Sequence, residues 1–395
     1  MIVTYQRALN SLHDYQKLTY LDDILASETT VEKLYVETVS ALIEDEESND
    51  TKESLPKKEA RGEATQEKQE EIRTIQEEIT QEERAQKEKS QSKKQDTTRS
   101  LTDKKKDKPL NILLLYGDDW TLKVLGVLNK LVKTPNLDKL AQRGMLFTHN
   151  CVTTSICMIS RATLYTGQYA SCHETYQIGS REMMAPGIWN ETLWPLLRTN
   201  GYYTGMVGKW HHPTPPKGTF DQYHPYYGEH FLTQTRNGNT ATKHVTAWNE
   251  EDALRFLDER PKDRLFALMV SFFAIHAEDF GSEMYRPQNE STHLYVNDTV
   301  PTPKTATQQH FQDLPYFFQN GKNFGRGRWH RRYDSPERYQ KMMKNMYRMV
   351  TEVDKTCGKI LDKLREQRVL DHTLVIFTTD NGNLHGEHGL AEKCK

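Results

Sequence analysis

The chain has 395 residues, with 53 Lys and Arg against 55 Asp and Glu, and its formal net charge is −2. This balance excludes the broad positive field of a protein that binds nucleic acid through its overall charge. No apolar run approaches the roughly 18 residues of a membrane span, and five cysteines without a C-x-x-C pair argue against a disulfide framework or a zinc site.

Residues 1–108 differ in composition from the rest of the chain. Residues 1–43 carry apolar side chains at helical spacing, which predicts an amphipathic helical segment. Residues 44–108 are almost all charged or polar and contain too few apolar side chains to offset the entropy of folding, so we expect a solvated helix or a disordered linker. The first residues lack a basic stretch followed by an apolar one, so the sequence as written predicts no secretion signal.

Residues 109–395 have the composition of a globular domain, in which strands and helices alternate. We predict strands at 111–116, 145–148, 202–207, 265–273 and 373–379, and helices at 134–141, 191–199, 249–259 and from 335 to about 364. Most of the strands are continuous apolar runs, typical of parallel strands buried on both faces. The pattern predicts an α/β fold, a mainly parallel sheet with helices on both faces, whose active site lies at the carboxyl ends of the strands.

Polar side chains follow the first and the last predicted strands. Asp118 and Asp119 come directly after the first strand, and Asp380 and Asn381 come after the last one. Adjacent buried carboxylates repel each other, so they need a cation or several hydrogen bonds to stay ionised. Four oxygen donors suit Ca²⁺ or Mg²⁺ better than zinc. Since Asp-Asn-Gly is also a common turn, either pair alone leaves a structural interpretation open.

Three further clusters carry nucleophilic, cationic or proton-transferring groups. Cys157 precedes a helical segment whose N-terminus would favour an anionic ester, and Arg161 lies one turn later. Lys209 and His211 follow the third predicted strand, and His276 follows the fourth. A lysine offers a point charge for an anion, and a histidine exchanges protons near neutral pH. A lone cysteine or histidine is often structural, and that alternative stays open for each residue alone.

Taken together and in this order, these stretches resemble the sulfatase family of the alkaline-phosphatase-like superfamily. The matching segments are 111–119, 134–167, 201–211, 265–276 and 339–393, which cover nearly everything after residue 109. The resemblance implies one Ca²⁺ or Mg²⁺ ion bound by Asp118, Asp119, Asp380, Asn381 and the modified Cys157. It also implies that Lys209, His211, His276 and Lys393 surround the sulfate, while Arg161 orients the modified Cys157.

The resemblance also implies a mechanism. A formylglycine-generating enzyme would oxidise Cys157 to formylglycine, and Arg161 would orient its hydrated form for attack on sulfur. His276 or Lys393 would protonate the leaving alcohol, and His211 would remove the proton that lets sulfate depart. The implied substrate is an aryl or carbohydrate sulfate, either a small molecule or a glycan. Family members are typically secreted, lysosomal or periplasmic, and the sequence leaves the location of this chain open.

Three features depart from the family pattern. Ile159 stands where Cys-x-Pro-Ser-Arg has Pro, or Ala, and we expect this bulky residue to slow or block the formation of formylglycine. The charged N-terminal hundred residues are atypical of the family. The chain ends at Lys395, whereas family members continue through further strands, so we expect an exposed sheet edge.

Two other functions stay open beside sulfate ester hydrolysis. One is a phosphomono- or diesterase of the same superfamily, and the other is a catalytically inactive domain that binds sulfated ligands. Residues 279–334 are rich in aromatic and basic side chains. Contact with an anionic sugar and an ordinary solvated loop fit that segment equally well, so we assign it no role.

Overall fold

A computed structural model describes residues 3–5, 109–176, 188–278, 283–319 and 323–393 of the chain. The chain divides into two compact units, and all of these residues belong to the unit formed by Met1–Leu9 and Pro109–Lys395. The predicted linker at 44–108 lies outside the described residues. Within the described part of the chain, every helix is too short or too polar to cross a membrane.

A mainly parallel sheet forms the centre of this unit. In the described residues, seven strands are arranged in the order β3-β1-β9-β2-β8-β4-β5. Their bounds are β1 Val3–Tyr5, β2 Asn111–Gly117, β3 Gly144–Leu146, β4 Tyr203–Gly208, β5 Gln222–Pro225, β8 Phe266–Ser271 and β9 Thr373–Thr379. The strands from β9 to β5 pair in parallel. Leu113 of β2 lies opposite Leu268 and Val375 on its neighbours, and all three side chains are buried.

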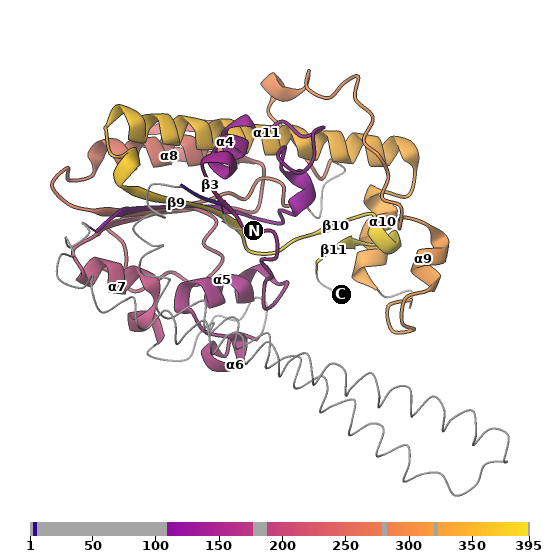
Figure 1. Cartoon of the computed structure of the whole chain (residues 1–395), viewed down its shortest axis with the longest axis horizontal. Helices are drawn as coiled ribbons and strands as arrows, with labels where there is room; N and C mark the ends of the chain where they lie inside the picture. The colour runs from indigo at the N-terminus through magenta and orange to yellow at the C-terminus, as the bar shows by residue number, and fades with distance from the viewer. Residues whose placement is uncertain (1–2, 6–108, 177–187, 279–282, 320–322, 394–395) are drawn as a thin grey trace, which may run out of the picture. The chain divides into compact units, whose positions relative to one another are not determined.

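Helices cover both faces of the sheet (Figure 1). One face carries α4 Pro135–Arg143, α8 Val245–Glu259 and α11 Pro336–Glu366, and the other carries α5 Cys157–Thr166, α6 Ala170–His173 and α7 Leu193–Thr199. Successive side chains of a strand point to opposite faces. Leu113 and Leu115 therefore pack into the core that includes the α8 and α11 side chains, while Leu114 and Tyr116 pack into the core around Trp194 of α7. This arrangement confirms the predicted α/β class.

Smaller elements lie beyond the carboxyl ends of the strands or between the main elements. They are β6 Phe231–Arg236, β7 Asn239–His244, α9 Gln308–Gln312, α10 Phe324–Arg332, β10 Leu384–His385 and β11 Ala391–Glu392, with the 3₁₀ turns η2 Leu122–Val124, η3 Ile188–Glu191, η4 Asn289–Ser291, η5 Leu370–His372 and η6 Glu387–Gly389. In its described residues, the aromatic and basic segment at 279–334 thus forms the short helices α9 and α10. The long helix predicted from residue 335 is α11, and Ser335 caps it by accepting a hydrogen bond from the Arg338 N–H.

Strand β1 departs from the sequence prediction. Apolar spacing predicts a helical segment over 1–43, whereas Val3–Tyr5 forms a strand antiparallel to both β9 and β3. Val, Thr and Tyr fit a pleated strand well, and pairing with two neighbours outweighs the local helical pattern. The helical prediction is wrong for these three residues, and the rest of the segment lies outside the described residues.

The boundaries of α8 and β3 also differ from the prediction, for local reasons. Helix α8 begins at Val245, four residues earlier than predicted, because the His244 side chain accepts a hydrogen bond from the Thr246 N–H at 3.2 Å and caps the helix. Histidine is not among the usual capping residues. Strand β3 is shorter than the predicted 145–148 and ends at Leu146, where its pairing with β1 ends.

The N-terminus of α4 is capped from another helix. The carboxylate of Asp354, on α11, accepts hydrogen bonds from the backbone N–H of Asn136 at 3.0 Å and of Leu137 at 2.8 Å. We expect Asp354→Ala to lower the free energy of unfolding by about 1–3 kcal/mol, because two helix-end donors lose their acceptor. Urea denaturation measures this loss. Asp362→Ala, at an exposed position of the same helix, is the control, and an equal loss in both variants would contradict the capping role.

Candidate active site

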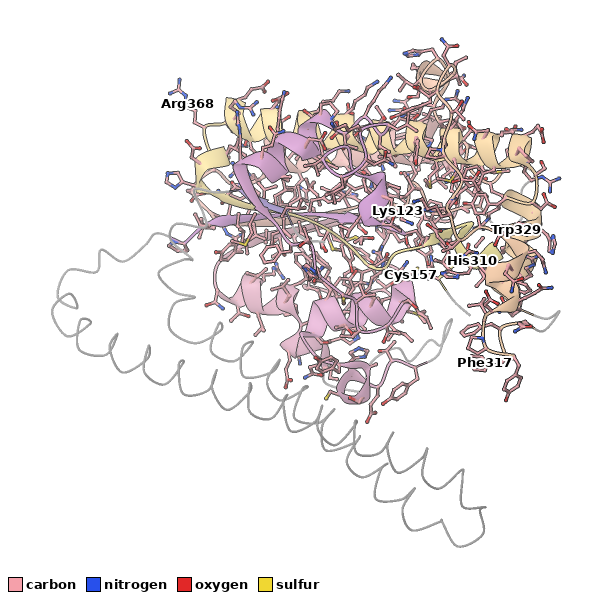
Figure 2. The ribbon with its side chains drawn as sticks, turned by 45° about the vertical axis from the view of Figure 1, so that its right-hand side comes forward. Lys123, Cys157, His310, Phe317, Trp329 and Arg368 are labelled. Atoms are coloured by element: carbon pink, nitrogen blue, oxygen red, sulfur yellow. The ribbon has the colours of Figure 1, made fainter. Side chains whose placement is uncertain are left out.

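The predicted site residues lie at the carboxyl ends of the strands. Asp118 follows β2, Lys209 follows β4, His276 follows β8 and Asp380 follows β9. In Figure 2, Cys157 lies at this end of the sheet, and Arg368, in the turn before β9, lies at the opposite end. The site is therefore where the rule for open parallel sheets places it.

Two strand-end turns bring four oxygen-bearing side chains together. Gly117 of β2 pairs with Thr379 of β9, so the turns that follow them start side by side. The backbone N–H of Asp119 donates to Asp380 Oδ1 at 3.3 Å, and Asn381 Nδ2 donates to Asp119 Oδ1 at 2.6 Å. Asp118, Asp119, Asp380 and Asn381 are all buried.

The donor set at these turns fits a hard divalent cation. The buried oxygens Asp118 Oδ1 and Asn381 Oδ1 have no hydrogen-bond partner. Asn381 uses its amide nitrogen on Asp119, which leaves its oxygen available to an ion. Burial and the neighbouring Asp118 carboxylate raise the pKa of Asp380 to about 6, so an added positive charge would favour its ionised form. Carboxylate and amide oxygens are the ligands that Ca²⁺ and Mg²⁺ prefer.

Four potential ligand atoms converge at one point of this site. Among the described residues, Asp118, Asp119, Cys157 and His276 each offer an atom within 4.8 Å of the others. Three of these four were predicted as metal ligands from the sequence, and His276 was predicted to contact sulfate. The structure therefore places His276 near the carboxylates as well as beside Cys157.

Cys157 is the first residue of α5 and is almost completely buried. Burial raises the pKa of its thiol well above the usual range. Since the thiolate is the nucleophilic form of cysteine, the unmodified side chain is a weak nucleophile at neutral pH.

Arg161 joins three strand ends from one turn further along α5. Its Nε donates to Asp380 Oδ2 at 2.9 Å, and its Nη1 donates to the Lys209 carbonyl at 2.7 Å and to Ser271 Oγ at 2.8 Å. The guanidinium also lies 4.7 Å from the centre of the Tyr116 ring. Through these contacts Arg161 fixes the ends of β4, β8 and β9 relative to one another.

Two lysines balance the carboxylates. Lys209 Nζ forms an ion pair with Asp118, and Lys393 Nζ forms one with Asp119. With the Arg161–Asp380 pair, three cationic side chains face three carboxylates, so these groups sum to zero charge. A bound divalent cation would give the site a net positive charge, which suits an anionic ester.

Both predicted histidines are held in the neutral form. Burial, followed by the nearby Lys393 charge, lowers the pKa of His276, and burial with the Lys209 charge lowers the pKa of His211 to about 2. His276 Nδ1 lies 2.8 Å from the carbonyl of Ala277, which can only accept a hydrogen bond. Its proton is therefore on Nδ1, and the lone pair is on Nε2, 3.9 Å from Asp119 Oδ2.

Four residues at the site have left-handed backbone conformations although none is glycine. The φ angles are 65° at Asp119, 61° at His211, 72° at Ile275 and 94° at Glu392. Each such conformation costs on the order of 1–3 kcal/mol and persists only where surrounding contacts enforce it. All four are a site residue or directly precede one, and such strain clusters at functional sites. No residue type in the sequence indicates this feature.

Sequence reasoning missed residues that support the site. Tyr116 reads as part of an apolar strand, and Ser271 reads as a break within one, yet both contact Arg161. Asn383 Nδ2 donates to Asp119 Oδ2 at 3.3 Å. A signal for Asn383 was present, because it continues the polar run that begins at Asp380.

A sequence model of the family described as Sulfatase matches residues 110–395. The chain is 24% identical to an N-acetylglucosamine-6-O-sulfatase of Bacteroides thetaiotaomicron, over 73% of this chain and 61% of that protein. It is 26% identical to the iduronate 2-sulfatase of Mus musculus, over 71% of this chain and 56% of that protein. The chain thus spans less than two thirds of the length of these relatives. A solved structure described as a complex with its substrate D-glucosamine-2-N,6-O-disulfate has the same fold, with a TM-score of 0.54, 20% identity and coverage of 72% of this chain and 68% of that one.

Proposed function

Because this chain belongs to the sulfatase family, we propose that it hydrolyses the sulfate ester of a carbohydrate. The observation that carries the proposal is the position of Cys157, at the start of a helix and within 4.8 Å of two carboxylates and His276. The class of substrate rests on the relatives, which are named for the 6-O-sulfate of N-acetylglucosamine and the 2-sulfate of iduronate.

The proposal includes one metal ion and one modified residue. Asp118, Asp119, Asp380 and Asn381, with the modified Cys157, would hold Ca²⁺ or Mg²⁺, which would supply positive charge next to the sulfuryl oxygens. Formylglycine made from Cys157 would supply the nucleophile that the buried thiol does not. The unpartnered oxygens of Asp118 and Asn381 support the metal assignment.

The other site residues would bind the ester and handle protons. Lys209 and Lys393 offer ammonium groups to the sulfate oxygens, and Arg161 keeps the Lys209 backbone in place. His211 is neutral, so it can accept a proton. Of the two candidate donors for the leaving alcohol, Lys393 carries a proton toward the site, whereas His276 has its proton directed at the Ala277 carbonyl. This favours Lys393 as the donor.

One observation supports the alternative of a domain that binds sulfated ligands without turnover. Ile159 stands at the Pro position of the modification motif, and the maturation enzyme reads this segment in extended form. A β-branched side chain there hinders the fit. The two functions differ in whether Cys157 becomes an aldehyde, so one experiment separates them.

The structure makes Ile159→Pro a usable test. Ile159 is the third residue of α5, and the first helical hydrogen bond runs from the Ser160 N–H to the Ile156 carbonyl at 2.9 Å. Proline at this position therefore removes no helical hydrogen bond. We expect Ile159→Pro to raise the converted fraction of Cys157 several-fold when the protein is co-expressed with a formylglycine-generating enzyme. Peptide mass spectrometry with an aldehyde-reactive probe measures the fraction.

Activity is then measured on the converted protein. We expect calcium-dependent release of inorganic sulfate from N-acetylglucosamine 6-sulfate or 4-nitrocatechol sulfate, and none from Cys157→Ala, which cannot form the aldehyde. Ile159→Ala is the matched control, since alanine is tolerated at this position of the family motif. Converted protein that releases no sulfate would overturn the hydrolase proposal and leave the binding function in its place.

A further inference from the structure

Lys393 enters the site from the end of a very short hairpin. Strands β10 and β11 contain two residues each, with Leu384 opposite Glu392 and His385 opposite Ala391. Lys393 follows directly, and its Nζ pairs with Asp119. A hairpin of this size is not stable on its own. Other contacts must therefore fix the direction of the Lys393 side chain.

The side chain of Glu392 provides such contacts. Arg332 Nη1 lies 2.6 Å from Glu392 Oε1, and Arg328 Nη1 lies 3.3 Å from Glu392 Oε2. Each carboxylate oxygen thus meets one arginine of α10, so the carboxylate cannot rotate freely. Arg332 is fully buried and Glu392 is 2% exposed. Removing Arg332 would take away the shorter of the two ion pairs of this buried carboxylate.

The backbone of Glu392 is strained, and such a conformation persists only where surrounding contacts enforce it. Its φ of 94° lies in the region that non-glycine residues rarely adopt. The neighbouring Lys393 side chain reaches the carboxylate of Asp119, while Glu392 itself reaches α10. If Glu392 were released, an ordinary backbone conformation at this residue would redirect Lys393.

Helix α10 is fixed to the hairpin along its length and can therefore serve as the anchor. Figure 1 shows α10 beside β10 and β11. Arg326 Nη1 donates to the Gly389 carbonyl at 2.8 Å. A Cβ atom on Gly325 would lie 3.0 Å from the Ala391 carbonyl, so glycine allows the close approach. At its other end, Arg332 Nε lies 3.2 Å from the Met284 sulfur.

We propose that Arg332 is a positioning residue that, through Glu392, holds Lys393 against Asp119 in the site. This gives a role to the basic segment for which the sequence indicated none. The use of Lys393 on sulfate rests on the proposed function, but its position can be measured without turnover.

The experiment measures the reactivity of individual lysines in protein whose Cys157 is unmodified. Lys393 and Lys209 have side chains that are 5% and 2% exposed, so an amine-acetylating reagent should modify both slowly in the wild type. We expect Arg332→Ala to raise the acetylation rate of Lys393 several-fold, by peptide mass spectrometry, and to leave Lys209 protected. Arg332→Lys should restore part of the protection. Arg331→Ala, at an exposed position of the same helix, should leave it unchanged.

A second variant guards against a loss of folding. Glu392→Gln keeps the size of the side chain and removes its charge, so it should release Lys393 with less disturbance. If Lys393 stays protected in both Arg332→Ala and Glu392→Gln, the proposal is wrong. If Lys209 becomes reactive together with Lys393 in both variants, the Arg332–Glu392 ion pair stabilises the whole fold. The proposal that it positions Lys393 in particular is then also wrong.

A kinetic arm separates this proposal from the proposed function. In converted protein, Arg332→Ala should lower kcat, and it should cause no further loss when Lys393 is already alanine. An independent loss in that background would contradict action through Lys393. If Lys393 is released as expected but converted wild type hydrolyses no sulfate ester, the proposed function fails and the positioning role stands.

Discussion

Arg161→Met is expected to lower the free energy of unfolding by about 3–5 kcal/mol and to remove measurable sulfate release. Methionine keeps much of the side-chain length but none of the donors. The buried Asp380 would lose its counter-charge, and the Lys209 carbonyl and the Ser271 hydroxyl would lose the same donor. Urea denaturation measures the stability, and sulfate release from converted protein measures the activity.

Two further variants identify the cause of this effect. Arg161→Lys keeps the charge but cannot reach all three partners, because an ammonium lacks the planar fork of a guanidinium, so we expect an intermediate loss. Arg365→Met removes an exposed arginine paired with Asp362 and should change stability by less than about 0.5 kcal/mol. If Arg161→Met lowers the free energy of unfolding by less than about 1 kcal/mol, other groups compensate the charge of Asp380. That result would contradict the role of Arg161 in fixing the three strand ends.

The central strands could be predicted because burial on both faces makes nearly all of their residues apolar. A strand covered by helices on both faces buries every side chain, as in β8, where Phe266–Ser271 is buried throughout. Such a run stands out without any knowledge of its partners. The three residues of β1 have no such pattern. They form a strand because they pair with segments about 140 and 370 residues away, and local sequence does not record such pairing.

The same distinction applies to the site. Parallel strands end at one edge, so the order of elements was enough to predict that Asp118 and Asp380 meet. The contacts between Arg332 and Glu392 could not be found in this way. They depend on how a helix outside the sheet packs on a two-residue hairpin, and on a left-handed backbone at a residue that is not glycine.

Ile159 shows that fold and activity place different demands on one position. In the folded chain it is a buried residue in the first turn of α5. If Cys157 is converted as proposed, the expected cost of Ile159 arises earlier, when a formylglycine-generating enzyme would bind the segment in extended form. A stable fold with an intact set of site residues is therefore compatible with a poorly converted Cys157.

Asp118→Asn is expected to remove the stabilisation that a divalent cation gives to the wild type. A ligand that binds only the folded state stabilises it by about 2.7 kcal/mol when its concentration is 100 times its Kd. We therefore expect Ca²⁺ to raise the Tm of the wild type above its value in a chelator, and expect no rise in Asp118→Asn. Differential scanning calorimetry measures both, and neither requires the aldehyde. In converted protein, the same variant should lose activity by at least about a thousandfold, since metal stabilisation contributes several kcal/mol to such reactions.

Asp252→Asn is the matched control for this prediction. Asp252 is also buried and paired with cationic side chains, Arg236 and Arg255, but it lies in α8, whereas Asp118 follows β2. It should keep the full response to Ca²⁺, whatever its own stability. If Asp118→Asn responds like the wild type, the ion is not bound at these strand ends. If only Mg²⁺ raises the Tm, the oxygen donors hold the smaller ion. Lys209 also affects the Kd of the ion. Its ammonium balances the charge of Asp118 in the absence of metal, so a cation must compete with Lys209 for this carboxylate.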